Sequence, residues 1–355
     1  MNEVRPKGGR MPAEWDPHDR TWMAWPANGY TLGETASEAR ETRTAWAAVA
    51  NAIVPFEPVT MVVPKADVEI ALEYLDERVN ILTAKLDDAW MRDIGPTFVR
   101  TPGKTVSAVN WVFNGWGSQD WASWNNDNLI ATKLAKATGV DVIASPLVNG
   151  GGGIHVNGAG TILLTETVQL DPGRNPDWTK KDVENELRRT LGVQRFVWLP
   201  RGLTRDYDEF GTRGHVDIVA CFSNENTVLF HAQRNAEHPD FWISNEVRRI
   251  LRELAKKWQK RDASGEPVGP PLRIIGIPAP EILRDDNDWV DYSYINHYVC
   301  NGAVIMGSFD DANDKIAARI LRRAYPGRQV VAVDARAIFA RGGGIHCITQ
   351  QQPSP

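Results

Sequence analysis

The sequence has few cysteines, no excess of basic residues and no long apolar run. Its three cysteines, Cys221, Cys300 and Cys347, are widely separated and form no CxxC pair. This spacing argues against a disulfide framework and against a cysteine-based zinc site. Lysine and arginine number 40 against 45 aspartate and glutamate residues, and the formal net charge is −5. A basic nucleic-acid-binding surface is therefore not expected.

Signals for membranes, export and common cofactors are also lacking. No stretch reaches the roughly 18 apolar residues of a membrane-spanning helix, and residues 1–15, MNEVRPKGGRMPAEW, have no apolar core of the secretory type. We therefore expect a cytoplasmic protein without a membrane partner. There is no HExxH, no P-loop and no GxGxxG between a strand and a helix. The expected chemistry is metal-free and needs no cofactor.

Helical and strand-like segments alternate along the whole chain. Helical spacing of apolar residues predicts helices at 35–55, 66–75, 126–137, 181–191, 244–258 and 314–324. Thr179 and Gly192 are expected caps of the fourth. Short β-branched or aromatic runs predict strands at 59–63, 79–83, 97–99, 161–165, 216–221, 227–230, 303–307 and 330–333. This alternation predicts an α/β fold, and we expect residues 1–355 to form one domain.

A weak internal repeat accompanies this alternation. The string GGGIH occurs at 151–155 and again at 342–346, and the segments 211–222 and 295–309 each combine glycine, histidine and an apolar strand. Such recurrence suggests modules of one supersecondary type stacked around a centre. Glycine clusters also arise wherever a backbone turns tightly, so the repeat alone does not identify the fold.

Cys347 lies eight residues before the end of the sequence and follows a run of three glycines that ends at Gly344. Glycines let the backbone approach a ligand closely, so a cysteine directly after them is well placed to face a cavity. The residue is therefore a candidate nucleophile, although most free cysteines are simply small buried side chains. Cys221 and Cys300 lie in apolar strand-like runs and are expected in the core.

The triplet His215-Val216-Asp217 is a candidate acid/base and carboxylate pair. In a strand, alternate residues share a face, so His215 and Asp217 would point into the same space. The pair could supply a proton-transferring imidazole and a carboxylate for a cation. His155 and His346, which flank the glycine clusters, are rival candidates for the imidazole.

Asp93 belongs to the charged segment 87–96, DDAWMRDIGP. Such a cluster beside a turn is usually a solvated loop. Its alternative role is in binding a guanidinium, which is planar and permanently charged. A guanidinium requires carboxylates in its plane and an aromatic face above it, here Asp93 and Trp90.

Together these segments resemble the agmatine deiminase family, which is related to bacterial peptidylarginine deiminases. The matching strings are MPAEWDPHDRTWMAWP (11–26), DDAWMRDIGPTFV (87–99), GGGIHVNGAGTILLTE (151–166), GTRGHVDIVACF (211–222) and GGGIHCITQQQP (342–353). They occur in family order over nearly the whole chain. The resemblance implies the pentein fold, a five-fold pseudosymmetric α/β propeller of ββαβ modules around a central pocket.

The resemblance also implies roles for four residues. Cys347 matches the nucleophile, His215 the general acid/base, and Asp93 and Asp217 the two carboxylates that hold the guanidinium. The implied reaction converts agmatine to N-carbamoylputrescine and ammonia through a covalent amidino-thioether on Cys347. No cofactor is implied.

One position departs from the family pattern. Family members usually carry a glutamate in a string like EGGxIH, thought to hydrogen-bond the catalytic histidine, and this chain has Gly150 there. Its loss should lower the pKa of the histidine and loosen its orientation, which predicts a weakened deiminase. Alternatively, the residue is a sampled or engineered substitution, the chemistry is altered, or Asp206, Asp208 or Glu166 replaces the glutamate.

The sequence leaves the substrate open. Arginine as substrate would require a basic partner for its carboxylate, and Arg213, Arg205 and Arg341 lie near the site motifs, with Arg213 expected on the strand face of His215. Structural ion pairs are the favoured role for these arginines. The alternatives are a deiminase or amidinotransferase acting on another guanidino compound, or a non-catalytic guanidine-binding homologue. A homo-oligomer is compatible with the sequence.

Overall fold

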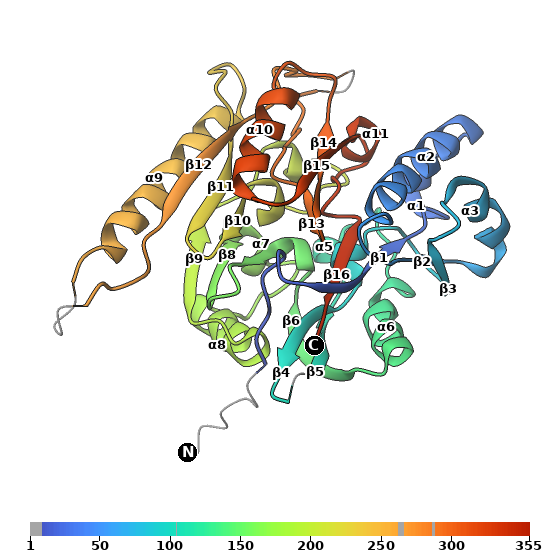
Figure 1. The fold of residues 1–355 in the computed structure, drawn as a ribbon, viewed down its shortest axis with the longest axis horizontal. Helices are drawn as coiled ribbons and strands as arrows, with labels where there is room; N and C mark the ends of the chain where they lie inside the picture. The colour runs from blue at the N-terminus through green and yellow to red at the C-terminus, as the bar shows by residue number, and fades with distance from the viewer. Residues whose placement is uncertain (1–8, 104, 262–265, 286–287) are drawn as a thin grey trace.

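A computed structural model describes residues 9–103, 105–261, 266–285 and 288–355. Figure 1 shows short sheets arranged around a centre, with helices on the outside. There are five sheets in the described part of the chain, and each contains one antiparallel and at least one parallel strand pair.

Four of the sheets are successive ββαβ modules. In each, two antiparallel strands are followed by a helix and a third strand that runs parallel to the second. A helix is the usual crossover between parallel strands. The strands and helices of these modules are β4 (Thr97–Thr101), β5 (Thr105–Val112), α6 (Ile130–Thr138) and β6 (Asp141–Val148); β7 (Ile154–Val156), β8 (Thr161–Thr165), α7 (Glu166–Gln169), α8 (Lys180–Leu191) and β9 (Arg195–Leu199); β10 (Ala220–Asn224), β11 (Thr227–Ala232), α9 (Asp240–Trp258) and β12 (Arg273–Pro278); and β13 (Tyr298–Cys300), β14 (Ala303–Ser308), α10 (Asp314–Ala324) and β15 (Gln329–Asp334).

The fifth module joins the two ends of the chain. The C-terminal strand β16 (Thr349–Pro353) pairs antiparallel with β1 (His18–Ala24), which is followed by helix α2 (Ala36–Ile53) and the parallel strand β2 (Val59–Val63). The same sheet ends with β3 (Asn80–Thr83), reached through α3 (Val68–Tyr74). The described part also contains the one-turn helices α1 (Gly29–Leu32), α4 (Met91–Ile94), α5 (Gly115–Ser118) and α11 (Arg336–Phe339). Short 3₁₀-helices lie at Lys65–Asp67, Asp127–Leu129, Gly151–Gly153, Arg205–Tyr207 and Val216–Ile218. The closed ring of five modules confirms the predicted α/β propeller.

The strongest helix predictions are confirmed with their physical causes. Helix α8 begins after Thr179, whose side chain accepts from the Asp182 N–H while the Asp182 carboxylate accepts from the Thr179 N–H, a capping box. It ends at Gly192, whose left-handed conformation (φ 68°) is open to glycine at little cost. Helix α2 is capped in the same way by Thr35 and Glu38.

One strand prediction is wrong at the residues that matter most. Residues 216–221 were expected to be a strand, but Val216–Ile218 form a turn of 3₁₀-helix and β10 starts only at Ala220. His215 and Asp217 therefore do not share a strand face. An apolar run of this kind can be buried either as a strand or as a tight turn, so its composition could not distinguish the two.

The core is formed mainly where helices pack on the outer faces of the sheets. Cys221 and Cys300 are buried in it, as expected. Among the described residues, no helix is long and apolar enough to span a membrane. Residues 1–8, the first half of the proposed non-secretory N-terminus, lie outside the described residues. The single domain over 1–355 stays a prediction.

Candidate active site

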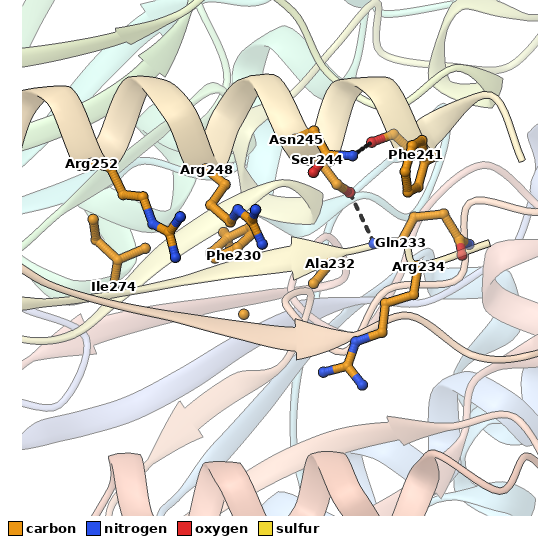
Figure 2. A pocket seen from close by; sticks show the side chains of 11 residues that line it. Phe230, Ala232, Gln233, Arg234, Phe241, Ser244, Asn245, Arg248, Arg252 and Ile274 are labelled. Carbon is orange, nitrogen blue, oxygen red and sulfur yellow. Dashed lines mark hydrogen bonds between the residues drawn. The ribbon is translucent and has the colours of Figure 1, made fainter. Parts of the chain in front are cut away.

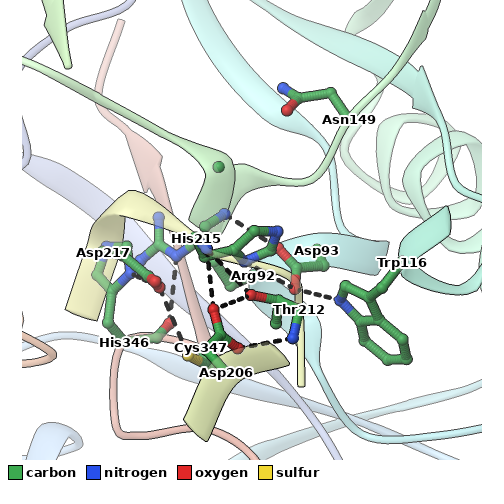
Figure 3. A network of polar contacts seen from close by, with 12 residues as sticks. Arg92, Asp93, Trp116, Asn149, Asp206, Thr212, His215, Asp217, His346 and Cys347 are labelled. Atoms are coloured by element: carbon green, nitrogen blue, oxygen red, sulfur yellow. Dashed lines mark hydrogen bonds and ion pairs between the residues drawn. The ribbon is translucent and has the colours of Figure 1, made fainter. Parts of the chain in front are cut away.

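The inner ends of the five modules meet at the centre of the ring. Each module contributes the segment directly before its first strand: Asp93 precedes β4, Gly150–Gly153 precede β7, His215 and Asp217 precede β10, Asn296 precedes β13, and Cys347 precedes β16. The glycine repeat noted in the sequence thus marks equivalent positions in different modules. Figure 3 shows most of these side chains turned toward one another.

Cys347 is held by groups from two other segments. Its Sγ lies 3.4 Å from Asp217 Oδ2 and accepts a hydrogen bond from Asn296 Nδ2 at 3.2 Å. Asn296 also accepts from the His346 N–H through Oδ1 at 2.9 Å. A Cβ on Gly344 would lie 2.4 Å from that same oxygen, so the glycine is required for this close packing. Cys347 is 6% exposed and therefore nearly sealed by these neighbours.

Gly152 marks the point around which the other polar groups converge. A Cβ placed there would lie 2.5 Å from His215 Nδ1, 3.0 Å from Asp217 Oδ2 and 3.2 Å from Asp93 Oδ1. The backbone N–H of Gly152 donates to Asp93 Oδ1 at 3.0 Å, and Trp116 Nε1 donates to Asp93 Oδ2 at 2.9 Å. The imidazole and both predicted carboxylates therefore surround one small space beside the thiol.

Two buried atoms in this space have no hydrogen-bond partner among the described residues, His215 Nδ1 and Asp217 Oδ1. The nearest carboxylate to the imidazole is Asp93, with 3.7 Å between His215 Nδ1 and Asp93 Oδ2. Buried polar atoms are normally paired, and unpaired ones cluster at functional sites. A ligand that carries several N–H donors would satisfy the free carboxylate oxygen.

The electrostatics favour the neutral thiol when no cation is bound. Burial raises the pKa of Cys347 well above its usual range, and the charges of Asp217 and Asp93 raise it further. A cation placed between the carboxylates would remove much of this penalty. The site is therefore arranged so that a bound cation promotes formation of the thiolate.

Asp217 is also part of a buried chain of charges. His346 bonds Asp217 Oδ2 through Nδ1 and Glu14 Oε1 through Nε2, both at 2.8 Å. Burial and Arg92 lower the pKa of His346, but Glu14 and Asp217 outweigh them and raise it overall. Burial likewise opposes ionisation of Asp217, yet the contact with His346 holds its pKa below the usual range. Asp217 is thus ionised against a charged His346.

His155, a candidate from the sequence, lies behind this chain and not beside the thiol. Its Nε2 is 3.5 Å from Glu14 Oε2, and its Nδ1 accepts from the Phe222 N–H at 3.2 Å. The ring centroids of His155 and His346 are 6.3 Å apart. Its link to the thiol side of the site runs through Glu14 and His346.

Trp90 lies against the cysteine loop, as a wall of the site requires. A Cβ on Gly343 would be 2.5 Å from Trp90 Cζ3 and 3.1 Å from Cys347 Cβ, so the Trp90 ring and Cys347 flank the same glycine.

Arg213 does not lie where the sequence predicted. It is exposed, lies in a turn with φ 67° and not in a strand, and so does not share a face with His215. Arg205 and Arg341 form ion pairs with Asp285 and Glu41, as favoured.

The backbone at Gly150 closes on Asp93. A Cβ at this position would lie 2.5 Å from Asp93 Oδ1 and 2.8 Å from its Cγ. The carboxylate of Asp93 thus occupies the room in which a side chain at 150 would begin. The family glutamate is absent here, and an aspartate from the neighbouring module stands in contact with the glycine.

Among the three residues suggested as replacements for that glutamate, Asp206 is the one attached to the His215 segment. Its carboxylate accepts from the N–H groups of Thr212, Gly214 and His215 and from the Thr212 hydroxyl. Asp208 is exposed, and Glu166 pairs with Lys180. Asp206 therefore fixes the backbone of His215, while its contacts with the imidazole are through charge only.

Sequence reasoning missed Asn296, Glu14 and Trp116. Asn296 occupies the place before β13 that corresponds to the other site residues, so the internal repeat could have identified it. Glu14 and Trp116 gave no comparable signal. No group of three or more His, Cys, Asp or Glu side chains within the described residues could hold a metal ion.

Comparison with known proteins agrees with this geometry. The family model of Porphyromonas-type peptidyl-arginine deiminases matches residues 10–353. The chain belongs to this family. A putative agmatine deiminase of Streptomyces coelicolor is 52% identical over 345 residues, 97% of this chain and 98% of that protein. The agmatine deiminase of Stutzerimonas stutzeri is 37% identical over 371 residues, 99% of this chain and 97% of that one.

Solved structures of this family share the fold. The agmatine deiminase of Enterococcus faecalis superposes with a TM-score of 0.87 at 30% identity, covering 98% of this chain and 96% of that one. A more distant similarity, to an amidinotransferase of Microseira wollei, has a TM-score of 0.52 at 12% identity and concerns the fold alone. The predicted membership of a guanidine-modifying pentein family is confirmed.

Proposed function

We propose that this protein is an agmatine deiminase, a hydrolase that converts agmatine and water to N-carbamoylputrescine and ammonia. The observation that carries the proposal is the free Asp217 Oδ1 beside Asp93, His215 and the Cys347 thiol. A guanidinium is planar and offers five N–H donors, so it can bond both carboxylates while its central carbon faces the sulfur.

In the first half of the reaction, the cation bound between Asp93 and Asp217 lowers the pKa of the Cys347 thiol. His215 takes the thiol proton, and the thiolate attacks the guanidinium carbon to form a C–S bond. His215 then returns this proton to the departing nitrogen as the C–N bond breaks. Ammonia leaves, and an amidino-thioether remains on Cys347.

In the second half, water attacks the same carbon while His215 accepts one of its protons. The C–S bond breaks as the remaining proton of the attacking oxygen passes to the sulfur and the C=O bond forms. The ureido product leaves, and His215 releases its proton to solvent, where ammonia takes it up as ammonium. Asn296 donates to the sulfur throughout and so favours its anionic form. Asp206 acts as a positioning residue because its carboxylate fixes the backbone that carries His215. Trp90 forms the wall beside the cysteine loop.

The test is product analysis with purified protein. With agmatine, we expect equal amounts of ammonia and N-carbamoylputrescine, and no product from Cys347→Ser. A clear preference for arginine in competition would overturn the substrate assignment, and an amidinated acceptor amine would indicate a transferase. If a haloacetamidine fails to modify Cys347, or if agmatine does not block the modification, the protein is a binding homologue and the proposal fails.

Three further statements remain predictions under this proposal. We expect the protein to work in the cytoplasm without a nucleic-acid or membrane partner, where agmatine and its ureido product would serve polyamine and putrescine biosynthesis. We expect that turnover requires no cofactor, and that the protein can form a homo-oligomer. Dialysis against a chelator before the assay tests the second statement, and light scattering tests the third.

A further inference from the structure

An acidic cavity lies beside the segment that carries His215. Its volume is about 430 Å³, and one wall is formed by Phe210, Gly211 and Gly342. Four carboxylates that also line it are Asp206, Asp208, Glu209 and Asp291. We propose that this cavity binds a primary alkylammonium group, either the free end of the guanidino substrate or one end of a separate aliphatic diamine. The first form rests on the proposed function.

Among the described residues, the negative charge of the cavity wall exceeds its positive charge. Arg205, a cation on its wall, already bonds Asp285 at 2.6 Å and the Trp289 carbonyl at 3.2 Å. Asp288, a fifth carboxylate on the wall, pairs with Arg284 at 3.0 Å. Asp206 already accepts from three backbone N–H groups and the Thr212 hydroxyl. Asp208, Glu209 and Asp291 remain without a paired cation among the described residues, which favours a positively charged occupant.

Asp291 is the residue that distinguishes this cavity from an ordinary acidic surface. It is only 7% exposed and faces the cavity, and within the described ranges no other residue makes a hydrogen bond or ion pair with its carboxylate. Burial, followed by the charge of Asp206, raises its pKa to about 7. Its own backbone N–H and the charge of Arg205 offset part of this burial. An ammonium with three donors would offset more of it.

The cavity and the catalytic site share their walls. Asp206 lines the cavity and also accepts from the His215 N–H at 3.0 Å. Gly342 begins the loop that leads to Cys347, and the next glycine lies against Trp90. The first form of the proposal places the aliphatic chain of the substrate along these shared segments.

The opposite charge is found in a separate cavity of about 350 Å³ between α9 and strands β11 and β12 (Figure 2). Arg234, Arg248 and Arg252 line it, and it shares no residue with the catalytic site. Its charge excludes it as a cation site. The acidic cavity is thus the one of these two that suits an amine.

The experiment compares agmatine with pentylguanidine, in which a methyl group replaces the ammonium. Ammonia release is measured for the wild type, Asp291→Asn and a control, Asp141→Asn, whose carboxylate is exposed at the start of β6. If the substrate's own end binds, Asp291→Asn raises KM for agmatine at least about tenfold and changes KM for pentylguanidine less than about twofold. Glu209→Gln, at an exposed position, should act in the same direction but less strongly.

A separate diamine gives a different pattern. Putrescine then alters pentylguanidine turnover in the wild type and in Asp141→Asn but not in Asp291→Asn, while KM for agmatine is unchanged. The inference is overturned if Asp291→Asn, with a wild-type Tm, changes neither the KM for agmatine nor the effect of putrescine. It is also overturned if Asp291→Asn changes the KM for agmatine and the KM for pentylguanidine by the same factor. If the wild type hydrolyses neither guanidine, the proposed function fails, and calorimetry with putrescine still decides the cavity: heat of binding in the wild type that disappears in Asp291→Asn supports it, and no heat overturns it.

Discussion

Replacement of Gly150 by alanine tests how the site has adapted to the missing glutamate. Gly150 has an extended backbone (φ −131°, ψ 159°), so alanine causes no backbone strain there. Its Cβ would nevertheless lie 2.5 Å from Asp93 Oδ1, where ordinary contact begins at 3.4 Å. The carboxylate must therefore move by about 1 Å, and it must weaken its bonds to Trp116 and Gly152.

A displacement of that size in a substrate-holding group costs on the order of 100-fold in rate. We therefore expect kcat/KM of Gly150→Ala for agmatine to fall at least about tenfold, with a Tm close to wild type. Gly9→Ala is the matched control, because its Cβ would meet nothing closer than 3.4 Å. In an Asp93→Ala background most of the cost of Gly150→Ala should disappear, since Asp93 Oδ1 and Cγ are removed and only its Cβ, 3.0 Å from the added Cβ, remains.

Gly150→Glu separates the geometric argument from the family pattern. The pattern predicts that glutamate restores a partner for His215 and raises kcat at least about threefold. The contact with Asp93 predicts a fall. Ammonia release measured for Gly150→Ala and Gly150→Glu side by side decides between them. Wild-type kcat/KM in Gly150→Ala would refute the reasoning from the structure.

Three further changes probe the surroundings of the thiol and the buried acids. Asn296→Ala removes the donor to Cys347 Sγ, and kcat should fall about 10- to 100-fold because hydrogen bonds to charged groups contribute about 1.5–3 kcal/mol; an unchanged kcat would show that the sulfur does not need this donor. Glu14→Gln removes a charge that holds His346 protonated, so the pH for half-maximal iodoacetamide labelling of Cys347 should rise; a fall would contradict the charge chain. Burial raises the pKa of Asp88 to about 7, above its unfolded value, so its effect on folding is unfavourable above about pH 4 and grows until about pH 7. Asp88→Asn should therefore become more stable relative to wild type by roughly 3 kcal/mol between pH 5 and pH 8 in urea unfolding, and a constant difference would show that Asp88 does not titrate in this range.

Much of the fold was evident in the sequence because the relevant signals are local. Helix α8 is bounded by a capping box and a glycine that lie within the same 14 residues, and β2 and β8 are short β-branched runs with the predicted bounds. The recurring glycine-containing segments mark four of the five modules, and they could not give the number of modules or their closure by β16. Cys347, His215, Asp93 and Asp217 could be named from the motif order, which the family resemblance made specific.

The tertiary structure decided what depends on residues far apart in the chain. The turn at Val216–Ile218 replaces the expected strand because the segment must bring Asp217 to His346, which lies 129 positions later. Glu14 and Trp116 became site residues only when loops from different modules met. The sequence by itself determined the chemical groups and the module pattern, since both are written in short stretches. Only the closed ring determined which groups face one another, because hydrogen bonds and charges act through space and not along the chain.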